Sequence, residues 1–400
     1  MIVVGEALAI LERTIAAGET EEVSVSEGAG RVLAREIVSD VDWPPFDTSA
    51  MDGYAVRLSD VPAAGTALAE RAGVVAAGAV PPSPLSPGES VRVMTGAPIP
   101  EGTEAIIPVE QAVRESGGVR FGEVPPAGAH IRRRGESVAA GTPLLPKGTR
   151  LLPAQVALCA LSGADPVKVF RRPRITVAVT GDEVVAPSER PGPGQLRDSN
   201  GPMLLSLCRA RGWPARARGP VRDEPDAVAR LFAEAGNEED FLITTGGVSA
   251  GDLDLLPELA RRSRFEILFH RVAVRPGRPI ACGRRGKTFW FGLPGNPVSA
   301  SVAFHLFVRY ALDRAEGDAR PGASRVTARL AREARGGGSR EVYRDCLVTS
   351  EEGGNRAEPL PSSGSHDLAA HARANALLRI PAGAGSLAAG SPVECLLLDA

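Results

Sequence analysis

The sequence feature that most constrains the fold is a glycine-rich segment, TTGGVSAGDLD, at residues 244–254. It follows an apolar run at residues 241–243 and precedes a helical pattern of leucines that begins at Leu255. A buried strand followed by a glycine loop and a helix is typical of an α/β sheet, in which ligands bind outside the carboxyl ends of the strands. We therefore interpret this segment as the strand-to-helix connection at a binding crevice.

The residue types in this connection suit a phosphate and a metal ion. Gly246 and Gly247 allow backbone N–H groups to approach an anion closely, and Ser249 adds a hydroxyl group. Asp252 and Asp254 can hold a divalent cation between that anion and the protein. A second interpretation stays open, in which the segment is only a tight connection with Asp252 as the helix N-cap.

Two further loops are expected at the same edge of the sheet. The apolar run 174–179 ends in TGDE (180–183), which places a second pair of carboxylates after a strand. The run 288–291 leads into GLPGNPVS (292–299), a turn stiffened by proline and followed by a helix. Because ligands bind at the carboxyl ends of the strands in such sheets, we expect the three loops to converge on one crevice.

Length and composition limit the remaining possibilities. The 400 residues exceed the usual size of a single core, so we expect about two to four domains. A formal net charge of -2 gives no reason to expect a nucleic acid or an anionic membrane as partner. No stretch approaches the roughly 20 apolar residues of a membrane span, and we expect a cytoplasmic protein. The scattered cysteines argue against a disulfide framework and are expected in cores, and the spacing of the histidines suggests no catalytic triad.

Changes in residue pattern along the chain predict four domains. Helical periodicity in the first residues returns at 150–170, which indicates that the β-rich segment between them is inserted. Strands alternate with helices from 173 to about 315, as in a parallel sheet with crossover helices, and short strands follow after 320. The predicted domains are an N-terminal linker domain (1–45 plus 141–172), an inserted β-rich domain (46–140), an α/β domain (173–318) and a C-terminal small β-barrel (319–400).

Eight segments along the chain form a set: PPFDTSAMDGYAV, VMTGAPIPEGTEAIIPVE, RRRGESV, TGDE, RDSN, TTGGVSAGDLD, RPGRP and GLPGNPVS. In sequence and order they resemble the motifs of the molybdopterin molybdenumtransferase family, whose eukaryotic relative is the gephyrin E domain. The resemblance covers essentially the whole chain. It implies an α/β molybdopterin-binding domain and an enzyme that inserts molybdate into adenylylated molybdopterin with release of AMP, assisted by Mg²⁺ or another divalent cation.

The resemblance also implies how the protein assembles. It indicates an elongated homodimer whose active site combines the α/β domain of one subunit with the first two domains of the other, and contact with a molybdopterin adenylyltransferase. By resemblance, six residues match positions that the family uses around the site: Asp52, Thr95, Asp223, Pro294, Pro297 and Ser365.

The chemistry of the residues completes the candidate site. Carboxylates that can hold the metal are Glu183, Asp252 and Asp254. Hydroxyl and guanidinium donors for the molybdate dianion are Ser199, Arg275, Arg278 and Ser299. The residues expected to act in catalysis are Asp52, Thr95, Glu183, Asp223 and Asp254. The residues expected to bind the substrate are Gly246, Gly247, Ser249, Pro294, Gly295, Asn296, Pro297 and Ser365.

Two positions depart from the family pattern, and two other functions stay open. Ser137 stands where the family usually has Asp, and RPGRP (275–279) stands where it usually has KPGKP. The alternatives are a molybdopterin adenylyltransferase, which shares the α/β module, and a gephyrin-like scaffold or paralogue with weakened catalysis. The sequence does not distinguish molybdate from tungstate, because the two anions are nearly identical in size and charge.

Overall fold

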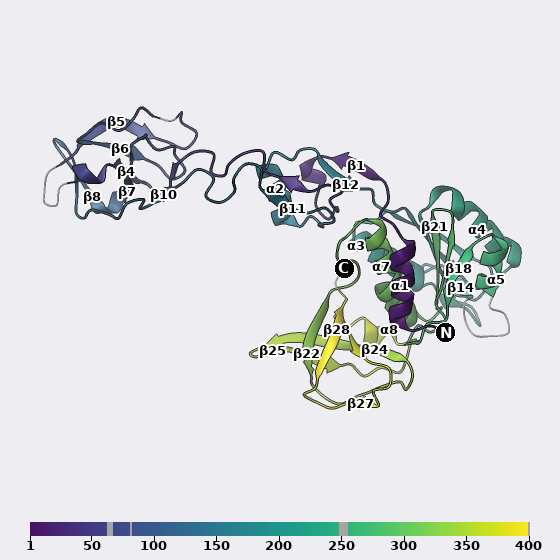
Figure 1. The fold of residues 1–400 in the computed structure, drawn as a ribbon. Coiled ribbons are helices and arrows are strands. Elements are labelled where there is room, and N and C mark those ends of the chain that lie inside the picture. The colour runs from purple at the N-terminus through teal and green to yellow at the C-terminus, as the bar shows by residue number, and fades with distance from the viewer. Residues whose placement is uncertain (62–66, 81, 248–254, 399–400) are drawn as a thin grey trace.

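The computed structural model describes residues 1–61, 67–80, 82–247 and 255–398, and the chain is elongated (Figure 1). A β-rich domain lies at one end, a small linker domain lies in the middle, and the α/β and C-terminal domains lie together at the other end. None of the helices in these ranges is long and apolar enough to cross a membrane.

The β-rich domain is built on a four-stranded sheet in the order β5-β6-β4-β7. Side chains alternate across β4, so Tyr54 and Val56 enter one apolar cluster and Ala55 enters another on the opposite face. The elements of this domain are β3 (Thr48–Ser49), β4 (Gly53–Val56), η2 (Leu58–Asp60), β5 (Ala69–Val75), β6 (Glu89–Val93), β7 (Ala105–Pro108), η3 (Val109–Gln111), β8 (Ala112–Glu115), β9 (Gly118–Phe121) and β10 (Ile131–Arg132).

The linker domain joins chain segments from both sides of the β-rich domain. Strand β1 (Thr20–Val23) pairs with β12 (Val167–Phe170), and β2 (Ile37–Val38) pairs with β11 (Pro143–Leu145). The expectation of a helix throughout 150–170 was wrong, because only α2 (Pro153–Leu161) is helical and the β-branched run at β12 is a strand. The linker also contains η1 (Val25–Glu27).

The first helix packs outside the linker domain. Helix α1 (Val4–Thr14) places Ala7, Leu11 and the following Ile15 in the main core of the α/β domain, where the helix lies beside α7 (Figure 1). The polypeptide therefore begins against the α/β domain and then crosses into the linker.

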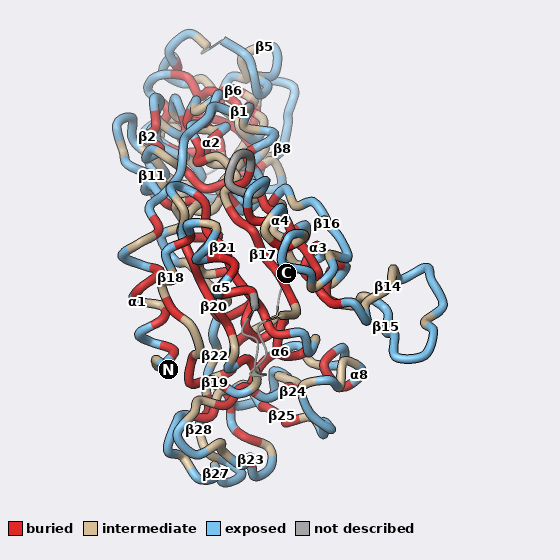
Figure 2. Tube along the Cα trace, turned by 90° about the vertical axis from the view of Figure 1, so that its right-hand side faces the viewer, coloured by how far each residue is buried: buried red, intermediate tan, exposed pale blue. Residues whose placement is uncertain are grey.

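The α/β domain contains a six-stranded sheet in the order β16-β13-β17-β21-β20-β18. All residues of β13, β17 and β21 are buried, as a sheet covered on both faces requires (Figure 2). The prediction of a parallel sheet holds for the first four strands, whereas β20 is antiparallel to both of its neighbours, β21 and β18. The strands are β13 (Ile175–Thr180), β14 (Val184–Val185), β15 (Leu196–Arg197), β16 (Ala215–Val221), β17 (Phe241–Thr245), β18 (Glu266–His270), β20 (Ala281–Arg285) and β21 (Thr288–Leu293).

Helices cover both faces of this sheet. One apolar cluster includes residues of α3 and α6, and a second, on the other face, includes residues of α4 and α5. Helix α6, the π-helical segment η4 and helix α7 follow one another without a break and form one long helical rod. This rod begins after the turn that follows β21. The helices are α3 (Asn200–Ala210), α4 (Pro225–Glu238), α5 (Leu255–Arg262), α6 (Pro297–Ala303), η4 (Phe304–Val308) and α7 (Arg309–Ala315).

The C-terminal domain is a closed five-stranded barrel, in which β24 pairs with both β25 and β26. The short strand β19 (Val274–Arg275) from the α/β domain pairs with β24 and connects the two domains. All five cysteines of the chain are buried and free, as expected for core residues. The elements are β22 (Arg325–Leu330), β23 (Ala334–Arg335), β24 (Glu341–Glu351), β25 (Gly354–Pro359), α8 (Leu368–His371), β26 (Ala376–Ile380), β27 (Ser386–Leu387) and β28 (Pro392–Leu397).

Candidate functional site

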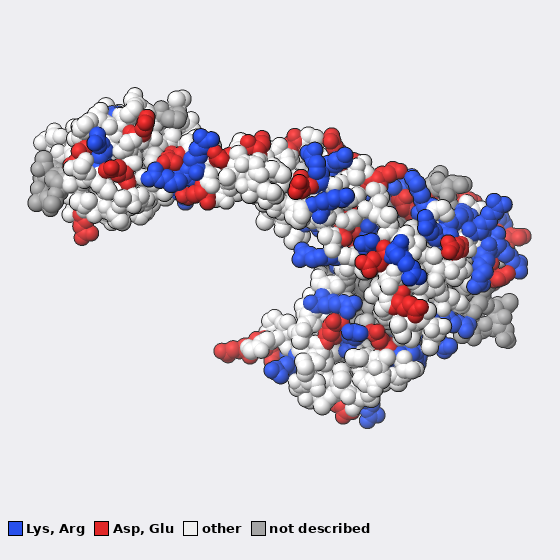
Figure 3. Space-filling model, viewed as in Figure 1, with Lys and Arg blue, Asp and Glu red and all other residues white. Residues whose placement is uncertain are grey.

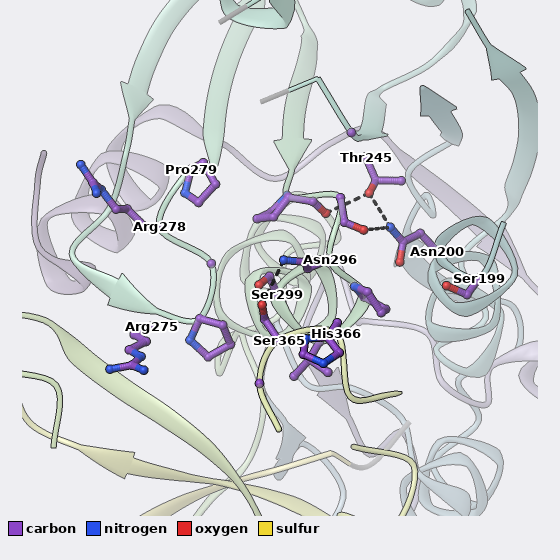
Figure 4. A pocket seen from close by; sticks show the side chains of 18 of the residues that line it. Ser199, Asn200, Thr245, Arg275, Arg278, Pro279, Asn296, Ser299, Ser365 and His366 are labelled. Atoms are coloured by element: carbon purple, nitrogen blue, oxygen red, sulfur yellow. Dashed lines mark hydrogen bonds between the residues drawn. The ribbon is translucent and has the colours of Figure 1, made fainter. Parts of the chain in front are cut away.

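A cavity of about 930 Å³ lies between the α/β domain and the C-terminal domain (Figure 4). Its walls come from the carboxyl ends of β13, β17 and β21, the loop 275–279, the start of α6, strand β24 and the loop 360–366. The three loops expected at one edge of the sheet therefore converge here, since their strands are neighbours in the sheet.

Most of the residues predicted for the site border this cavity. Those that line it are Glu183, Ser199, Gly246, Arg275, Arg278, Pro294, Gly295, Asn296, Pro297, Ser299 and Ser365. Gly247 and Asp223 are adjacent to lining residues but do not line the cavity themselves, and Asp52 and Thr95 lie in the distant β-rich domain. Ser249, Asp252 and Asp254 lie outside the described residues.

The glycines that follow β17 are required by close packing. Gly246 has φ 98° and Gly247 has φ 60°, and a Cβ atom on Gly246 would lie 2.2 Å from the carbonyl oxygen of Thr180. The N–H of Gly246 donates to the carbonyl oxygen of Leu293 at 3.3 Å, so it is engaged in the protein rather than directed at an anion. The role of Gly246 in this structure is to let the ends of three strands approach one another.

Asn200 connects the loops around the cavity. Its Nδ2 donates to Oγ1 of Thr245 at 2.8 Å and to the carbonyl oxygen of Gly295 at 2.7 Å (Figure 4). Thr245 in turn donates to the carbonyl oxygen of Pro294 at 3.0 Å. The Oδ1 atom of Asn200 is buried without a hydrogen-bond partner among the described residues, so it is available to a donor group of a ligand.

The loop 360–366 is attached to the start of α6. Nδ2 of Asn296 donates to Oγ of Ser365 at 3.0 Å, and the backbone N–H of Val298 donates to the carbonyl oxygen of Ser365 at 3.1 Å. These bonds hold the C-terminal domain against the GLPGNP turn, so Ser299 and Ser365 lie close together at the base of the cavity (Figure 4).

Arginine side chains line the side of the cavity formed by the loop 275–279 and β24. Arg275, Arg278, Arg340 and Arg344 border it, and none of the four forms an ion pair or side-chain hydrogen bond within the part of the chain that the structure describes. Burial lowers the pKa of Arg344, and the positive charges of Arg275 and Arg335 lower it further. Guanidinium groups that repel one another and have no carboxylate partner favour an anionic ligand.

Three carboxylates interact beyond the carboxyl ends of β13 and β16, and of these Glu183 lines the cavity. Burial raises the pKa of Asp223, a hydrogen bond with Thr180 lowers it, and the charges of Glu183 and Asp182 raise it again. The Oδ1 atom of Asp223 is buried and has no hydrogen-bond partner among the described residues. Adjacent carboxylates with an unsatisfied oxygen fit a divalent cation. However, no group of three acidic, histidine or cysteine side chains is arranged as a metal site within the ranges described.

Asp52 and Thr95 form a cluster of their own in the β-rich domain. Oδ1 of Asp52 accepts from the backbone N–H of Thr95 at 2.8 Å and from its hydroxyl at 2.7 Å. The hydroxyl bond is the largest cause of the lowered pKa of Asp52, followed by the backbone bond, and Arg92 contributes a further small lowering. The two residues are therefore positioned together, on the domain farthest from the cavity of the same chain (Figure 1).

Sequence reasoning missed several polar residues of the cavity, among them Asn200, Thr245, Arg340 and Arg344. Asn200 belongs to the RDSN motif and Thr245 to the glycine-rich motif, so both carried a signal that was assigned only to their neighbours. Arg340 and Arg344 belong to the C-terminal barrel and come into place only through the pairing of β19 with β24.

Family models match nearly the whole chain. The MoeA N-terminal region (domains I and II) matches residues 2–163, a probable molybdopterin binding domain matches residues 176–314, and the MoeA C-terminal region (domain IV) matches residues 327–398.

Known relatives match at full length. The molybdopterin molybdenumtransferase of Bacillus subtilis (strain 168) is 35% identical over 392 residues, which cover 95% of this chain and 90% of that protein. That of Haemophilus influenzae is 33% identical over 380 residues, which cover 94% of this chain and 93% of that protein. The crystal structure of the molybdopterin biosynthesis MoeA protein from Pyrococcus horikoshii OT3 has a TM-score of 0.83 at 30% identity, with 99% of this chain and 100% of that chain covered. The chain therefore belongs to the molybdopterin molybdenumtransferase family, whose members are enzymes of molybdenum cofactor biosynthesis.

Proposed function

We propose that this protein inserts molybdate into adenylylated molybdopterin and releases AMP, in the cavity between the α/β and C-terminal domains. The observation that carries the proposal is that Arg275, Arg278, Arg340 and Arg344, which have no ion-pair partner among the described residues, line the same cavity as Glu183. Both molybdate and the pyrophosphate of the substrate are anions, and guanidinium groups bind tetrahedral oxyanions through charge-assisted hydrogen bonds.

We assign the residues around the cavity by their chemistry. Arg275 and Arg278, with Ser199 and Ser299, are proposed to bind molybdate, since they supply charged and hydroxyl donors on both sides of the cavity (Figure 4). The substrate would lie over the turns that carry Gly246, Gly247, Ser249, Pro294, Gly295, Asn296, Pro297 and Ser365. Arg340 and Arg344 extend the cationic side onto the C-terminal domain.

A divalent cation fits the acidic side of the cavity. Glu183 would hold it, with Asp223 beside it and with Asp252 and Asp254 completing the set predicted from the sequence. When bound, such a cation would neutralise charge on the pyrophosphate and so favour its cleavage. The Oδ1 of Asp223, which has no hydrogen-bond partner among the described residues, supports a cation near Glu183, because a buried carboxylate oxygen needs a hydrogen bond or a positive charge.

We infer that the complete site requires two subunits. Asp52 and Thr95 are positioned together by two hydrogen bonds, yet the arm that carries them extends away from the cavity and leaves a wide concave space beside the C-terminal domain (Figures 1 and 3). In a homodimer, this cluster would reach the substrate bound by the partner subunit. Contact with a molybdopterin adenylyltransferase, which would deliver the substrate, and a cytoplasmic location complete the proposal.

The observations favour this function over the alternatives. An adenylyltransferase would not need the N-terminal and C-terminal regions, whereas the relatives named molybdopterin molybdenumtransferase cover about 95% of the chain. A scaffold with weakened catalysis would lose its charged site residues, whereas here the carboxylates and arginines remain. Ser137 stands where the family usually has Asp. The backbone N–H of Ser137 donates to the carbonyl oxygen of Trp43.

A reconstitution with adenylylated molybdopterin, Mg²⁺ and either molybdate or tungstate tests the proposal. We expect AMP release and active cofactor that depend on the oxyanion, and the ratio of the two rates identifies the preferred metal. Consumption of ATP with unmodified molybdopterin would instead identify an adenylyltransferase. Absence of AMP release under all conditions would contradict the proposed function.

A subunit-mixing experiment tests the shared site. Asp52→Ala and Glu183→Gln chains, each inactive alone, should recover about a quarter of the parental activity after random exchange, because half the dimers are mixed and each contains one intact site. If mixed dimers are verified by mass and no activity returns, the site is built within one chain.

A further inference from the structure

Three buried polar side chains link the rod at the base of the cavity to the C-terminal domain. Oγ of Ser301 in α6 lies 2.8 Å from Nε2 of His371 in α8, and Nδ1 of His371 lies 2.6 Å from Oδ1 of Asp345 in β24. The exposed fractions are 2% for Ser301, 8% for His371 and 6% for Asp345. The spacing of the histidines in the sequence gave no indication of this arrangement.

The direction of the hydrogen bonds follows from the groups involved. An ionised carboxylate only accepts, so Nδ1 of His371 carries the proton and donates to Asp345. Nε2 is then free to accept from the hydroxyl of Ser301. The order resembles that of a hydrolytic triad, but the serine is buried inside the domain junction and cannot reach a substrate. The network therefore does not serve nucleophilic catalysis.

Asp345 is the member of the network that borders the cavity. It follows Arg344 in β24 and lines the same cavity as Arg275 and Arg340. A carboxylate that could turn freely at this wall would pair with one of these guanidinium groups and compete with an anionic ligand. Its bond to His371 and its burial fix the carboxylate inside the domain junction, and the four cavity arginines have no ion-pair partner among the described residues.

We propose that His371 is a positioning residue that holds the carboxylate of Asp345 away from the cavity arginines, and thereby keeps them available for an oxyanion. The proposal rests on the proposed function, in which this cavity binds molybdate. Its central consequence is that the cost of losing His371 arises from the charge released at Asp345, not from the lost contact with α6.

Two amide variants separate the two hydrogen bonds. In His371→Gln, the amide can replace Nε2 toward Ser301 but cannot reach Asp345 as Nδ1 does. In His371→Asn, the amide nitrogen lies where Nδ1 was and can still donate to Asp345. We expect molybdate binding to the full-length protein, measured by calorimetry, to weaken about tenfold in His371→Gln and to stay within about threefold of the parent in His371→Asn.

A second substitution tests whether the released charge is the cause. Asp345→Asn in the His371→Gln background removes the competing charge and should restore affinity to within about threefold of the parent. Ser301→Ala, which leaves the bond between His371 and Asp345 in place, should bind molybdate as the parent does, with a modest loss of thermal stability.

The outcomes distinguish this inference from the proposed function. If the parent does not bind molybdate at all, the proposed function is wrong. If the parent binds but His371→Gln binds equally well, or if Asp345→Asn fails to restore the affinity that His371→Gln loses, then His371 has only a structural role and the inference is overturned.

Discussion

Arginines at two domain junctions of this molecule have opposite surroundings. Between the linker and the α/β domain, Arg150 donates to Asp313 at 2.8 Å, to Glu316 at 2.9 Å and to Asp318 at 2.9 Å, and its side chain is 13% exposed. Between the α/β and C-terminal domains, the four cavity arginines have no such partner among the described residues.

The pKa values of the two sites shift in opposite directions. Burial lowers the pKa of both Arg150 and Arg344. The carboxylates around Arg150 more than offset this effect, so its pKa is raised overall, whereas neighbouring arginines lower that of Arg344 further. A buried guanidinium that is paired within the protein therefore fixes a junction, while exposed guanidinium groups at a cavity, with no carboxylate partner among the described residues, stay available to a ligand.

The largest expected effect is a loss of stability at the junction between the linker and the α/β domain, where Arg150 is paired. Arg150→Met removes the closest cation from Asp313 and Glu316, whose side chains are 1% and 0% exposed, and leaves them Arg211 at 3.0 Å and Arg172 at 3.9 Å. We expect the free energy of unfolding of the α/β domain to fall by about 3 kcal/mol, the low end of the cost of breaking a buried ion pair, because these arginines still compensate part of the charge. Trp213, whose Nε1 donates to Glu316 at 2.9 Å, reports on this region by fluorescence during urea unfolding.

The matched control is Arg344→Met at the cavity. Because this variant relieves repulsion rather than breaking a pair, we expect a change within about 0.5 kcal/mol. If the free energy of unfolding falls equally in Arg150→Met and Arg344→Met, the two junctions do not differ in how their arginines contribute to stability.

The acidic side of the cavity should affect turnover more than stability. Glu183→Gln keeps the shape of the side chain but removes a charge from the proposed cation site. We expect turnover to fall on the order of 100-fold at saturating Mg²⁺, with the folded state retained. The same result is expected for Asp254→Asn. Turnover near that of the parent in both variants would refute the assignment of these carboxylates to the metal.

On the cationic side, Arg278→Ala should raise the half-saturating molybdate concentration or weaken nucleotide binding. The expected loss is about 2 kcal/mol, as for a charge-assisted hydrogen bond. Arg278→Lys should recover much of it, since an ammonium group also binds a tetrahedral oxyanion. If steady-state assays give the same constants for the parent and the alanine variant, Arg278 is only a surface residue.

The smallest expected effect concerns a paired arginine in the β-rich domain. The bond from Arg71 is the largest cause of the lowered pKa of Glu89, which falls to about 2. A depressed carboxyl pKa gives stability that is present above its ordinary value of 4.5 and is lost as pH falls toward 2. Glu89→Gln should remove at most about 1 kcal/mol of that pH dependence, because the pair is partly solvated. Calorimetric melting between pH 5 and 2 measures it, and identical profiles would show that this pair contributes nothing.

Much of the fold could be predicted because local sequence patterns specify its strands and turns. The fully buried strands β13, β17 and β21 read as continuous apolar runs, and proline and glycine mark the turns that follow them. Strands β18 and β20, which pair antiparallel with each other, were missed because their mixed segments, EILFH and ACGRR, have no clear periodicity. Their assignment depends on pairing with β21, a tertiary contact.

The residues of the site also differ in whether the sequence could predict them. Residues inside the motifs, such as Glu183 and Asn296, were predicted because each lies just after a strand. Arg344 and His371 could not be predicted, since their positions depend on how the barrel packs against α6. Asp252 and Asp254 lie outside the described residues, so their part in the site stays a prediction.

Calorimetric titration of molybdate into the parent, Arg275→Ala and Arg150→Lys shows whether the cavity arginines bind the oxyanion and the paired Arg150 does not. We expect saturable binding by the parent and by Arg150→Lys, and binding weakened about tenfold or more in Arg275→Ala. An affinity that is unchanged in Arg275→Ala, or lost equally in Arg150→Lys, would refute the assignment of the cavity arginines to the oxyanion.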